Sequence, residues 1–415
     1  MRQRILIIGA GFAGLWSALS AARLLELEGA GNDAVEIALV APQPALVIRP
    51  RLYEANAANM VAPLQELFDA VGVRYIQGTV EKIDTAAAAT VIAEPDGVRI
   101  SLAYDRLVLA AGSQLFRPQL PGLREYGFSV DQLNEAVQFE NHCQRLAQRP
   151  ATGARNTVVV AGGGFTGIEI AAELPARLSA ILGRANSSVN SSTDGRADGV
   201  RVIIVESANE IGPELGPGPR PVIVQALSAI GIECRLGTAV TAINADSVVT
   251  SSGERIETNT VVWTAGMRAS PLTAQIAGQR DPIGRLHVDR DLKVPTSPNV
   301  FATGDCAYVA TDNDGHHALM SCQHALRLGR SAGNNAAASL LGRPTTPYRQ
   351  HRYVTGLDLG SWGAVHTEGW DRKVVLSGAP SKARKHYVNS VLIYPPKANR
   401  TEALAAAKPP TADSD

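Results

Sequence analysis

Three glycines near the amino terminus have the spacing Gly-x-Gly-x-x-Gly, which is typical of a turn that binds a dinucleotide. Gly9, Gly11 and Gly14 follow an apolar run, residues 4–8, and overlap the start of an alanine-rich run, residues 13–27. Where a strand turns into a helix, this spacing lets the backbone approach a pyrophosphate, and the positive amino end of the helix faces the phosphates. A single copy is a weak signal, because a purely structural turn can have the same spacing.

A second copy of the turn lies 153 residues downstream, counted from Gly9 to Gly162. Residues 158–167 align without gaps on residues 5–14, and both copies continue with a helix pattern, a second apolar strand and a strand that ends in Ala-Gly. The chain is therefore predicted to contain an internal duplication. The matched residues are Gly9, Gly11, Phe12 and Gly14 with Gly162, Gly164, Phe165 and Gly167, and Ala111-Gly112 with Ala265-Gly266.

The repeated order of strands and helices predicts the fold class. We expect an α/β protein with two Rossmann-like dinucleotide-binding domains and a small C-terminal α+β cap, because a glycine-punctuated β-like run occupies residues 353–365. Residues 183–199 are rich in Ser, Asn, Asp and Gly and predict an exposed, mobile insertion. The Pro-containing tail from Thr401 has little to bury and is expected to be disordered.

Composition and charge argue against several classes of function. The 415 residues include 39 Lys and Arg and 39 Asp and Glu, so the formal net charge is zero and gives no footprint for nucleic acid or an anionic membrane. The four cysteines form no CxxC or metal-like spacing, which favours a cytoplasmic location and predicts no metal site. The apolar run over residues 5–22 also fits a signal peptide or membrane anchor, but the second glycine turn favours dinucleotide binding.

Two dinucleotide sites in one chain predict a bound carrier and an exchangeable partner, and FAD with NADH is the natural pair. Glu206 closes the strand of the second copy, where a carboxylate accepts hydrogen bonds from the adenosine ribose and repels a 2′-phosphate. This favours NADH over NADPH, although a solvated carboxylate at a strand end is the plainer alternative. The first copy has Ala41 at the corresponding place, so its ribose must be held by another group.

These residues resemble those of the two-dinucleotide-binding flavoproteins, and most closely the type II NADH dehydrogenases, which are NADH:quinone oxidoreductases that do not pump protons. The likeness covers residues 4–341. The most specific match is Ala302-Thr303-Gly304-Asp305, whose aspartate in this family hydrogen-bonds the ribityl chain of FAD. The other matching segments are residues 9–14, 49–54, 162–173 and 263–266.

The resemblance implies a role for individual residues. Glu169 is placed beside the nicotinamide and the flavin, and Gln323 is kept near the flavin, so both are candidate catalytic residues. A turn or helix-capping role is the alternative for Asp305, and a favourable first-turn position is the alternative for Glu169. The implied FAD site comprises Gly9, Gly11, Phe12, Ala13, Gly14, Arg51, Ala111, Gly112, Gly304 and Asp305, and the implied NADH site comprises Gly162, Gly164, Phe165, Thr166, Gly167, Glu206, Ala265 and Gly266.

The resemblance also implies a discontinuous domain arrangement. Residues 1–115 and 268–342 are predicted to form the FAD-binding domain, and residues 116–267 the NADH-binding domain. Residues 343–398 are predicted to form the cap, and residues 399–415 a disordered tail.

The implied activity is hydride transfer from NADH to flavin N5, followed by transfer of two electrons to a quinone or another small aromatic acceptor. Where the family usually has two glutamines after Gln323, this chain has Arg327 and Leu328, and Pro395-Pro396 interrupts the apolar run that follows residue 388. A soluble quinone or another aromatic oxidant, which Arg327 could contact, is therefore favoured over a membrane-embedded lipid quinone, with at most peripheral membrane association. A surface-facing Arg327 is the alternative. Two other functions stay open, a reductase of a small redox protein and a non-catalytic sensor, and the protein could form a homodimer. His324 is expected to be a packed helix residue.

Overall fold

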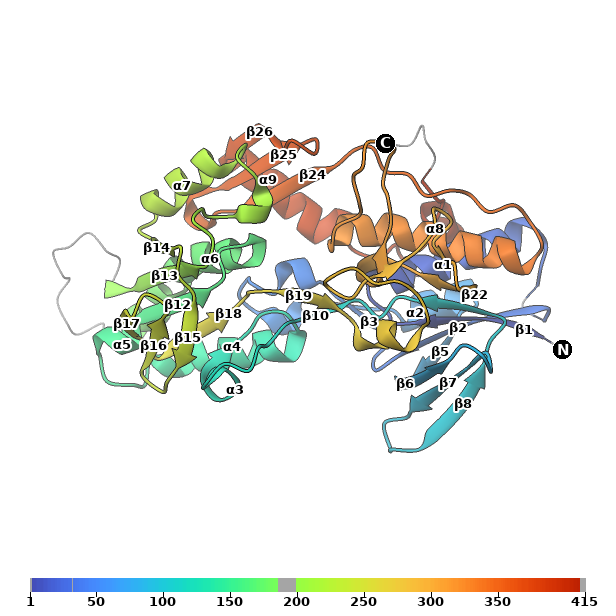
Figure 1. The fold of residues 1–415 in the computed structure, drawn as a ribbon, viewed down its shortest axis with the longest axis horizontal. Helices are drawn as coiled ribbons and strands as arrows, with labels where there is room; N and C mark the ends of the chain where they lie inside the picture. Colours follow the sequence, from blue (N-terminus) through green and yellow to red (C-terminus); the bar gives the residue numbers. More distant parts are fainter. Residues whose placement is uncertain (1, 32, 186–198, 411–415) are drawn as a thin grey trace.

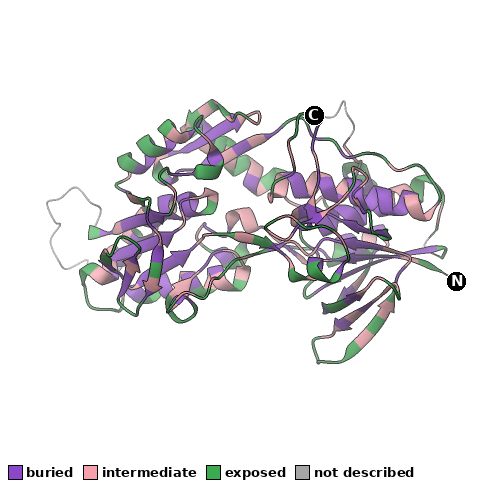
Figure 2. Ribbon diagram, in the orientation of Figure 1, coloured by how far each residue is buried: buried purple, intermediate pink, exposed green. Residues whose placement is uncertain are grey.

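The computed structural model describes residues 2–31, 33–185 and 199–410 and contains two parallel sheets with helices around them (Figure 1). The insertion predicted over residues 183–199 lies mostly outside these ranges. Buried residues are concentrated in the two sheets and in the helices that cover them (Figure 2). None of the described helices combines the length and apolarity needed to span a bilayer.

The first module is a six-stranded sheet with helices α1 (Phe12–Leu27) and α8 (Cys322–Leu340). Its central strand β1 is apolar because it is covered on both faces, and residues 5–8 of this strand are all buried. All its strand pairs are parallel except β21 with β22. The sheet order is β21 (Lys293–Val294), β22 (Ser297–Ala302), β9 (Arg106–Leu109), β1 (Gln3–Ile8), β2 (Val35–Ala41) and β5 (Arg74–Gln77).

Helices α1 and α8 lie side by side although nearly 300 residues separate them in sequence (Figure 1). A Cβ atom on Gly329 would lie 2.4 Å from the carbonyl oxygen of Ala13, and one on Gly333 would lie 2.0 Å from that of Ser17. The two backbones can therefore touch only because both α8 positions are glycine. This packing brings the segment around Asp305 to the first glycine turn.

The second module is a five-stranded parallel sheet with helix α6 (Phe165–Ala185). Its central strand β12 is flanked by β13 and β18 as β1 is flanked by β2 and β9, so the sheet order repeats the predicted duplication. The two parallel sheets and their helices confirm the predicted α/β fold class. The sheet order is β11 (Gly127–Phe128), β18 (Thr260–Trp263), β12 (Thr157–Ala161), β13 (Arg201–Glu206) and β14 (Glu233–Leu236).

Each module also contains a three-stranded antiparallel sheet, which follows the edge strand β5 along the chain in the first module and the edge strand β14 in the second. The first contains β6 (Thr79–Asp84), β7 (Ala89–Ala93) and β8 (Arg99–Ala103), and the second contains β15 (Val240–Ile243), β16 (Ser247–Thr250) and β17 (Arg255–Glu257). Smaller elements include α2 (Gln65–Val71), α3 (Leu123–Tyr126), α4 (Leu133–Leu146), α5 (Gly153–Asn156), α7 (Arg220–Ala229), β3 (Ala45–Val47), β4 (Val61–Pro63), β20 (Leu286–His287) and β23 (Ala307–Tyr308).

Two short strands cross between the modules, β10 (Ser113–Leu115) and β19 (Met267–Ala269), and they pair with each other (Figure 1). The cap comprises β24 (Val354–Asp358), β25 (Ala364–Glu368), β26 (Lys373–Gly378) and helix α9 (Ala379–Tyr387). It packs on α6, where a Cβ on Gly360 would lie 2.0 Å from the carbonyl oxygen of Ala172. The domain boundaries themselves remain a prediction.

The expectation of a disordered tail over residues 399–415 was wrong for residues 399–410. Helix α10 (Arg400–Ala406) follows Asn399, whose side chain accepts a hydrogen bond from the Glu402 amide at 3.0 Å. The tail does have apolar surface to bury, because Leu404 and its alanine neighbours pack in the core near α1 and α2. Arg400 also forms an ion pair with Glu26 of α1 at 2.5 Å. Residues 411–415 lie outside the described part of the chain.

Candidate active site

The first glycine turn joins β1 to α1. Gly9 has φ of +106°, and a Cβ there would lie 2.4 Å from the carbonyl oxygen of Ala110. A Cβ on Gly14 would lie 1.8 Å from the carbonyl oxygen of Gly9, so the helix packs directly on the strand end. By contrast, Gly11 is exposed and a Cβ there would meet nothing within 4 Å. The turn leaves open space at the amino end of α1, and the amino end of a helix is a suitable place for a phosphate group.

The second glycine turn joins β12 to α6 and is built in the same way. Gly162 has φ of +115°, and a Cβ there would lie 3.0 Å from the Ala265 amide nitrogen. A Cβ on Gly167 would lie 1.9 Å from the carbonyl oxygen of Gly162. In both modules the structure thus brings the predicted Ala-Gly segment, Ala111-Gly112 or Ala265-Gly266, against the predicted glycine turn.

Asp305 lies just after β22, beside the first glycine turn. Ser113 Oγ donates a hydrogen bond to Asp305 Oδ2 at 2.5 Å, and Arg49 Nη1 lies 3.8 Å from the same oxygen. A Cβ on Gly304 would lie 2.7 Å from Ala13 Cβ, which ties this segment to the first turn of α1. The capping alternative gains no support, because the side chain that caps α8 is that of Ser321.

These residues fit FAD. The open space at Gly11 suits a pyrophosphate, and the Asp305 carboxylate can accept hydrogen bonds from hydroxyls. The buried Thr303 hydroxyl at the same sheet edge has no hydrogen-bond partner among the described residues. Where the first copy lacks a carboxylate, Tyr75 and Gln77 reach the end of β2, donating to the carbonyl oxygens of residues 41 and 42 at 2.7 and 3.1 Å.

The structure separates two arginines that the sequence placed in one loop. The predicted residue, Arg51, donates to Glu54 at 2.7 Å and to the Tyr394 hydroxyl at 3.1 Å. Arg49 instead faces the FAD-type site, where it contacts Asp305 and also bonds Asp131. Sequence reasoning missed Arg49, because a choice between two arginines two positions apart needs the orientation of their loop.

Glu206 stands at the end of β13 and is buried. The Gly163 amide donates to its Oε2 at 2.6 Å, and the Ala208 amide donates to its Oε1 at 2.8 Å. These bonds fix the carboxylate beside the second glycine turn. Glu206 occupies the place of Ala41, since the carbonyl preceding each residue accepts a bond from the first glycine of its turn. A fixed carboxylate here fits NADH.

Glu169 is buried in α6, five residues into the helix. Lys385 Nζ donates to its Oε1 at 2.9 Å, and the Asp358 amide donates to the same oxygen at 3.0 Å. Burial raises the pKa of Glu169 to about 7, while Lys385 and the Asp358 amide oppose that rise. The first turn of α6 contains no acidic residue, so a helix-dipole role does not explain this position.

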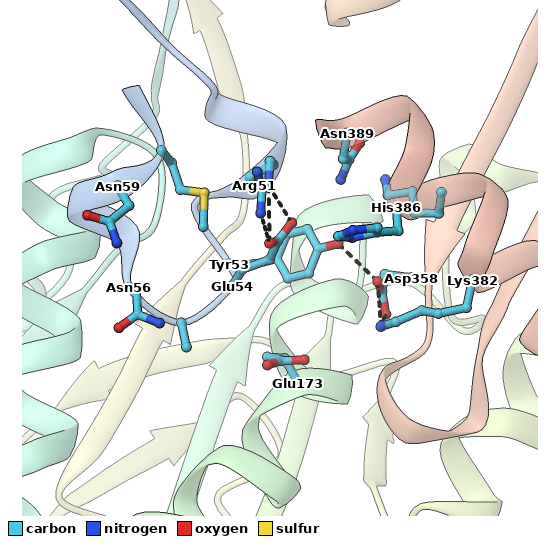
Figure 3. Close-up of a pocket in the computed structure, with 13 residues that line it drawn as sticks. Arg51, Tyr53, Glu54, Asn56, Asn59, Glu173, Asp358, Lys382, His386 and Asn389 are labelled. Carbon is cyan, nitrogen blue, oxygen red and sulfur yellow. Dashed lines mark hydrogen bonds and ion pairs between the residues drawn. The ribbon is translucent and has the colours of Figure 1, made fainter. Parts of the chain in front are cut away.

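A polar cavity of about 590 Å³ lies between the loop after β3, helix α6 and the cap (Figure 3). Within it, Lys382 Nζ contacts both carboxylate oxygens of Asp358 at 2.5 and 2.7 Å, and the Tyr53 hydroxyl donates to Asp358 at 3.1 Å. Burial, together with the nearby carboxylates, raises the pKa of the Tyr53 phenol well above its ordinary value. The lining residues are Arg51, Tyr53, Glu54, Ala55, Asn56, Asn59, Met60, Glu173, Asp358, Lys382, Lys385, His386 and Asn389.

The amide of Gln323 holds the cap to helix α8. Its Nε2 donates to the Val354 carbonyl at 3.1 Å, and its Oε1 accepts from the Val354 amide at 3.3 Å. A catalytic role for Gln323 stays a prediction. His324 is fully buried against Tyr353, and burial lowers its pKa to about 3, which agrees with a packed helix residue.

Two cysteines lie near the proposed FAD site, and Cys306 donates to the Gly112 carbonyl at 3.4 Å. Burial raises the pKa of the Cys306 thiol to about 12 and also raises that of Cys322, so neither is a ready thiolate. Asp312, Asp314 and His316 are grouped, and Asp312 is held there by bonds from the His316 ring at 2.7 Å and from two backbone amides.

Comparison with known proteins agrees with this geometry. The chain is 45% identical over 415 residues to the NADH dehydrogenase-like protein MT1860 of Mycobacterium tuberculosis, covering 98% of each chain. It is 33% identical over 375 residues to the demethylphylloquinone reductase NdbB of Synechocystis sp., covering 88% of this chain and 86% of that protein. The fold matches NDH2 from Plasmodium falciparum in complex with NADH, with a TM-score of 0.75, 14% identity and 98% of each chain covered.

Residues 3–329 match the model of a single protein family, described as pyridine nucleotide-disulphide oxidoreductase. This match covers both glycine turns and Asp305. It confirms the expected flavoprotein resemblance and the expected class of enzyme, an oxidoreductase. The chain belongs to the pyridine nucleotide-disulphide oxidoreductase family.

Proposed function

We propose that this protein is an FAD-dependent NADH:quinone oxidoreductase. The observation that carries this proposal is the pair of matching glycine turns, one beside Asp305 and the other beside Glu206. Glu169 is buried nearby and pairs with Lys385, which lines a polar cavity. Relatives named as an NADH dehydrogenase-like protein and a demethylphylloquinone reductase support the same reaction. In balanced form, NADH, one proton and a quinone yield NAD⁺ and a quinol.

Bound FAD supplies the hydride and electron chemistry, and the chain supplies binding, orientation and protons. The backbone amides at the amino ends of α1 and α6 bind the two pyrophosphates. Asp305, held by Ser113, accepts hydrogen bonds from hydroxyls of FAD, and Glu206 accepts those of the NADH ribose. The proposed FAD site also includes Gly11, Arg49 and Thr303.

Glu169 is the group best suited to hold a proton during the reaction. Its pKa of about 7 lets it carry or release a proton at neutral pH. Lys385 fixes its position and stabilises the charged form, because the ammonium group donates directly to the carboxylate. Both side chains are at most 10% exposed, so water competes little for this bond.

The quinone binds in the polar cavity beside the cap. Its volume of about 590 Å³ lies within the usual range for small-molecule sites. Arg51, Lys382 and Lys385 line it and can donate hydrogen bonds to quinone carbonyls or to an anionic substituent. Arg327, which the sequence suggested for this task, is not among the residues that line the cavity.

The test is anaerobic reduction of the purified yellow protein by NADH, followed by addition of menadione, a naphthoquinone without a side chain. We expect NADH to bleach the flavin absorption and menadione to restore it over many cycles. Failure of NADH to bleach the flavin contradicts the proposal. Bleaching without turnover by any quinone favours the sensor alternative.

A further inference from the structure

The carboxylate of Glu214 lies directly over the second glycine turn. The Phe165 amide, at the amino end of α6, donates to Glu214 Oε1 at 2.6 Å. A Cβ on Gly164 would lie 2.6 Å from the same oxygen and 3.4 Å from Oε2. Gly164 is the middle glycine of the turn, over which a dinucleotide pyrophosphate passes. The carboxylate therefore occupies the position expected for a phosphate group.

The first glycine turn shows what this place looks like without such a carboxylate. Gly11 is the counterpart of Gly164, and a Cβ there would meet nothing within 4 Å. No side chain caps α1, whereas the carboxylate of Glu214 bonds the first residue of α6. Since the two turns otherwise match glycine for glycine, the presence of Glu214 is the feature that distinguishes the second site.

Glu214 and a pyrophosphate must compete for this place. The amino end of a helix carries roughly half a positive charge and several unpaired amides, which stabilise one anion well. The Phe165 amide cannot donate fully to both anions, and the two negative charges repel each other at this distance. Nucleotide binding thus requires that the Glu214 carboxylate leaves.

The local structure lets that carboxylate leave without disturbing the fold. Glu214 is exposed, whereas the next residue, Leu215, is buried and anchors the segment. Gly212 and Gly216 flank the short helical turn with φ of +59° and +72°, and the Gly212 amide bonds the Gly163 carbonyl at 2.9 Å. Rotation of the Glu214 side chain into solvent is therefore sufficient.

We infer that Glu214 sets the affinity of the NADH site: its carboxylate stands in for the pyrophosphate when no nucleotide is bound and must be displaced by NADH or NAD⁺. This inference rests on the proposed function. Both nucleotides share the pyrophosphate, so Glu214 weakens the binding of substrate and product alike. Weak product binding favours release of NAD⁺ after each cycle.

The test measures the Kd of NAD⁺ by calorimetry in the FAD-loaded protein, where no turnover occurs. We expect Glu214→Gln and Glu214→Ala to bind NAD⁺ roughly 10-fold more tightly, because a charge-assisted bond no longer competes. Glu257→Gln is the matched control, since Glu257 is exposed on the separate β17 strand and its neutralisation changes the net charge equally. The Kd of that control should equal the wild-type value.

Thermal unfolding gives a second readout. Without nucleotide, Glu214→Ala should unfold at a lower temperature than wild type, because the Phe165 amide loses its partner. With NAD⁺, its stabilisation should exceed that of wild type, since ligand stabilisation grows with affinity. Unchanged or weaker NAD⁺ binding in both Glu214 variants overturns the inference and leaves the proposed function intact. Absence of NAD⁺ binding in the wild-type protein contradicts both.

Discussion

Lys385 of the cap donates to Glu169 of the second module across 2.9 Å, although the two residues are 216 positions apart in sequence. Lys385 Nζ also lies 5.4 Å from the centre of the Phe165 ring and donates to the Gly356 carbonyl at 2.7 Å. One lysine thus connects the cap strand β24, the start of α6 and the buried carboxylate. Loss of the cap contact would change the charge at Glu169, which is the basis of the first prediction.

Glu169→Gln should remove a pH dependence centred near neutrality. In the folded protein the pKa of Glu169 is about 7, whereas its ordinary value is 4.5. Wild-type kcat should therefore change with an inflection near pH 7, and the variant should lack it. Lys385→Met should move the inflection to higher pH, because the ammonium group no longer favours the charged form. An identical profile for all three proteins contradicts the assignment.

The same shift affects stability. Between pH 4.5 and 7 the folded protein keeps the Glu169 proton that the unfolded chain has released, so stability falls as the pH rises. The contribution lost above pH 7 is about 3 kcal/mol. Urea unfolding at pH 5 and pH 8 should show that part of the pH dependence in wild type and not in Glu169→Gln.

The two dinucleotide-binding modules could be predicted from sequence because both glycine turns need glycine at the same positions. A Cβ on Gly9, Gly14 or either counterpart would lie 3.0 Å or less from a backbone atom, so both copies need glycine at the same places. The cap side of the site could not be predicted in this way. Asp358, Lys382 and Lys385 form no motif, and only tertiary packing brings them to Glu169.

The tail shows a different limit. Residues 401–407 read as Thr-Glu-Ala-Leu-Ala-Ala-Ala, with a single large apolar residue, and this composition suggested disorder. Leu404 nevertheless packs on an apolar surface near α1 and α2. Small alanines permit close helix contact without large side chains, so the pattern is visible only once its partner surface is known.

Asp305→Asn should weaken FAD binding. The carboxylate lies beside the first glycine turn and accepts from Ser113, and loss of charge-assisted hydrogen bonds costs about 1.5–3 kcal/mol, or roughly 10- to 100-fold in affinity. Ser113→Ala should have a smaller effect in the same direction, because it removes only a group that orients Asp305. Titration of the apoprotein with FAD, followed by flavin fluorescence, measures both. Equal FAD affinity in wild type and Asp305→Asn removes this residue from the site.

Glu206→Gln should narrow the preference for NADH over NADPH. In wild type the carboxylate is held by the Gly163 and Ala208 amides at the strand end, where its charge repels a 2′-phosphate. The variant keeps the shape and loses the charge. We expect kcat/KM to fall with NADH and to rise with NADPH, as measured with a fixed quinone concentration. If the wild-type protein has the same kcat/KM with NADPH as with NADH, the assignment of this site is contradicted.

Gln323→Ala should separate a structural role from a catalytic one. Both ends of the amide are bonded to Val354, so their loss should lower the free energy of unfolding by about 1–3 kcal/mol. Gln323→Glu keeps the acceptor to the Val354 amide but places a carboxylate against the Val354 carbonyl, so it should be at least as unstable. If Gln323 only ties the cap to α8, kcat with menadione should fall in proportion to the loss of cap protection measured by hydrogen exchange. A large fall in kcat with normal unfolding and normal exchange at β24 would instead support the catalytic role that the family resemblance implies.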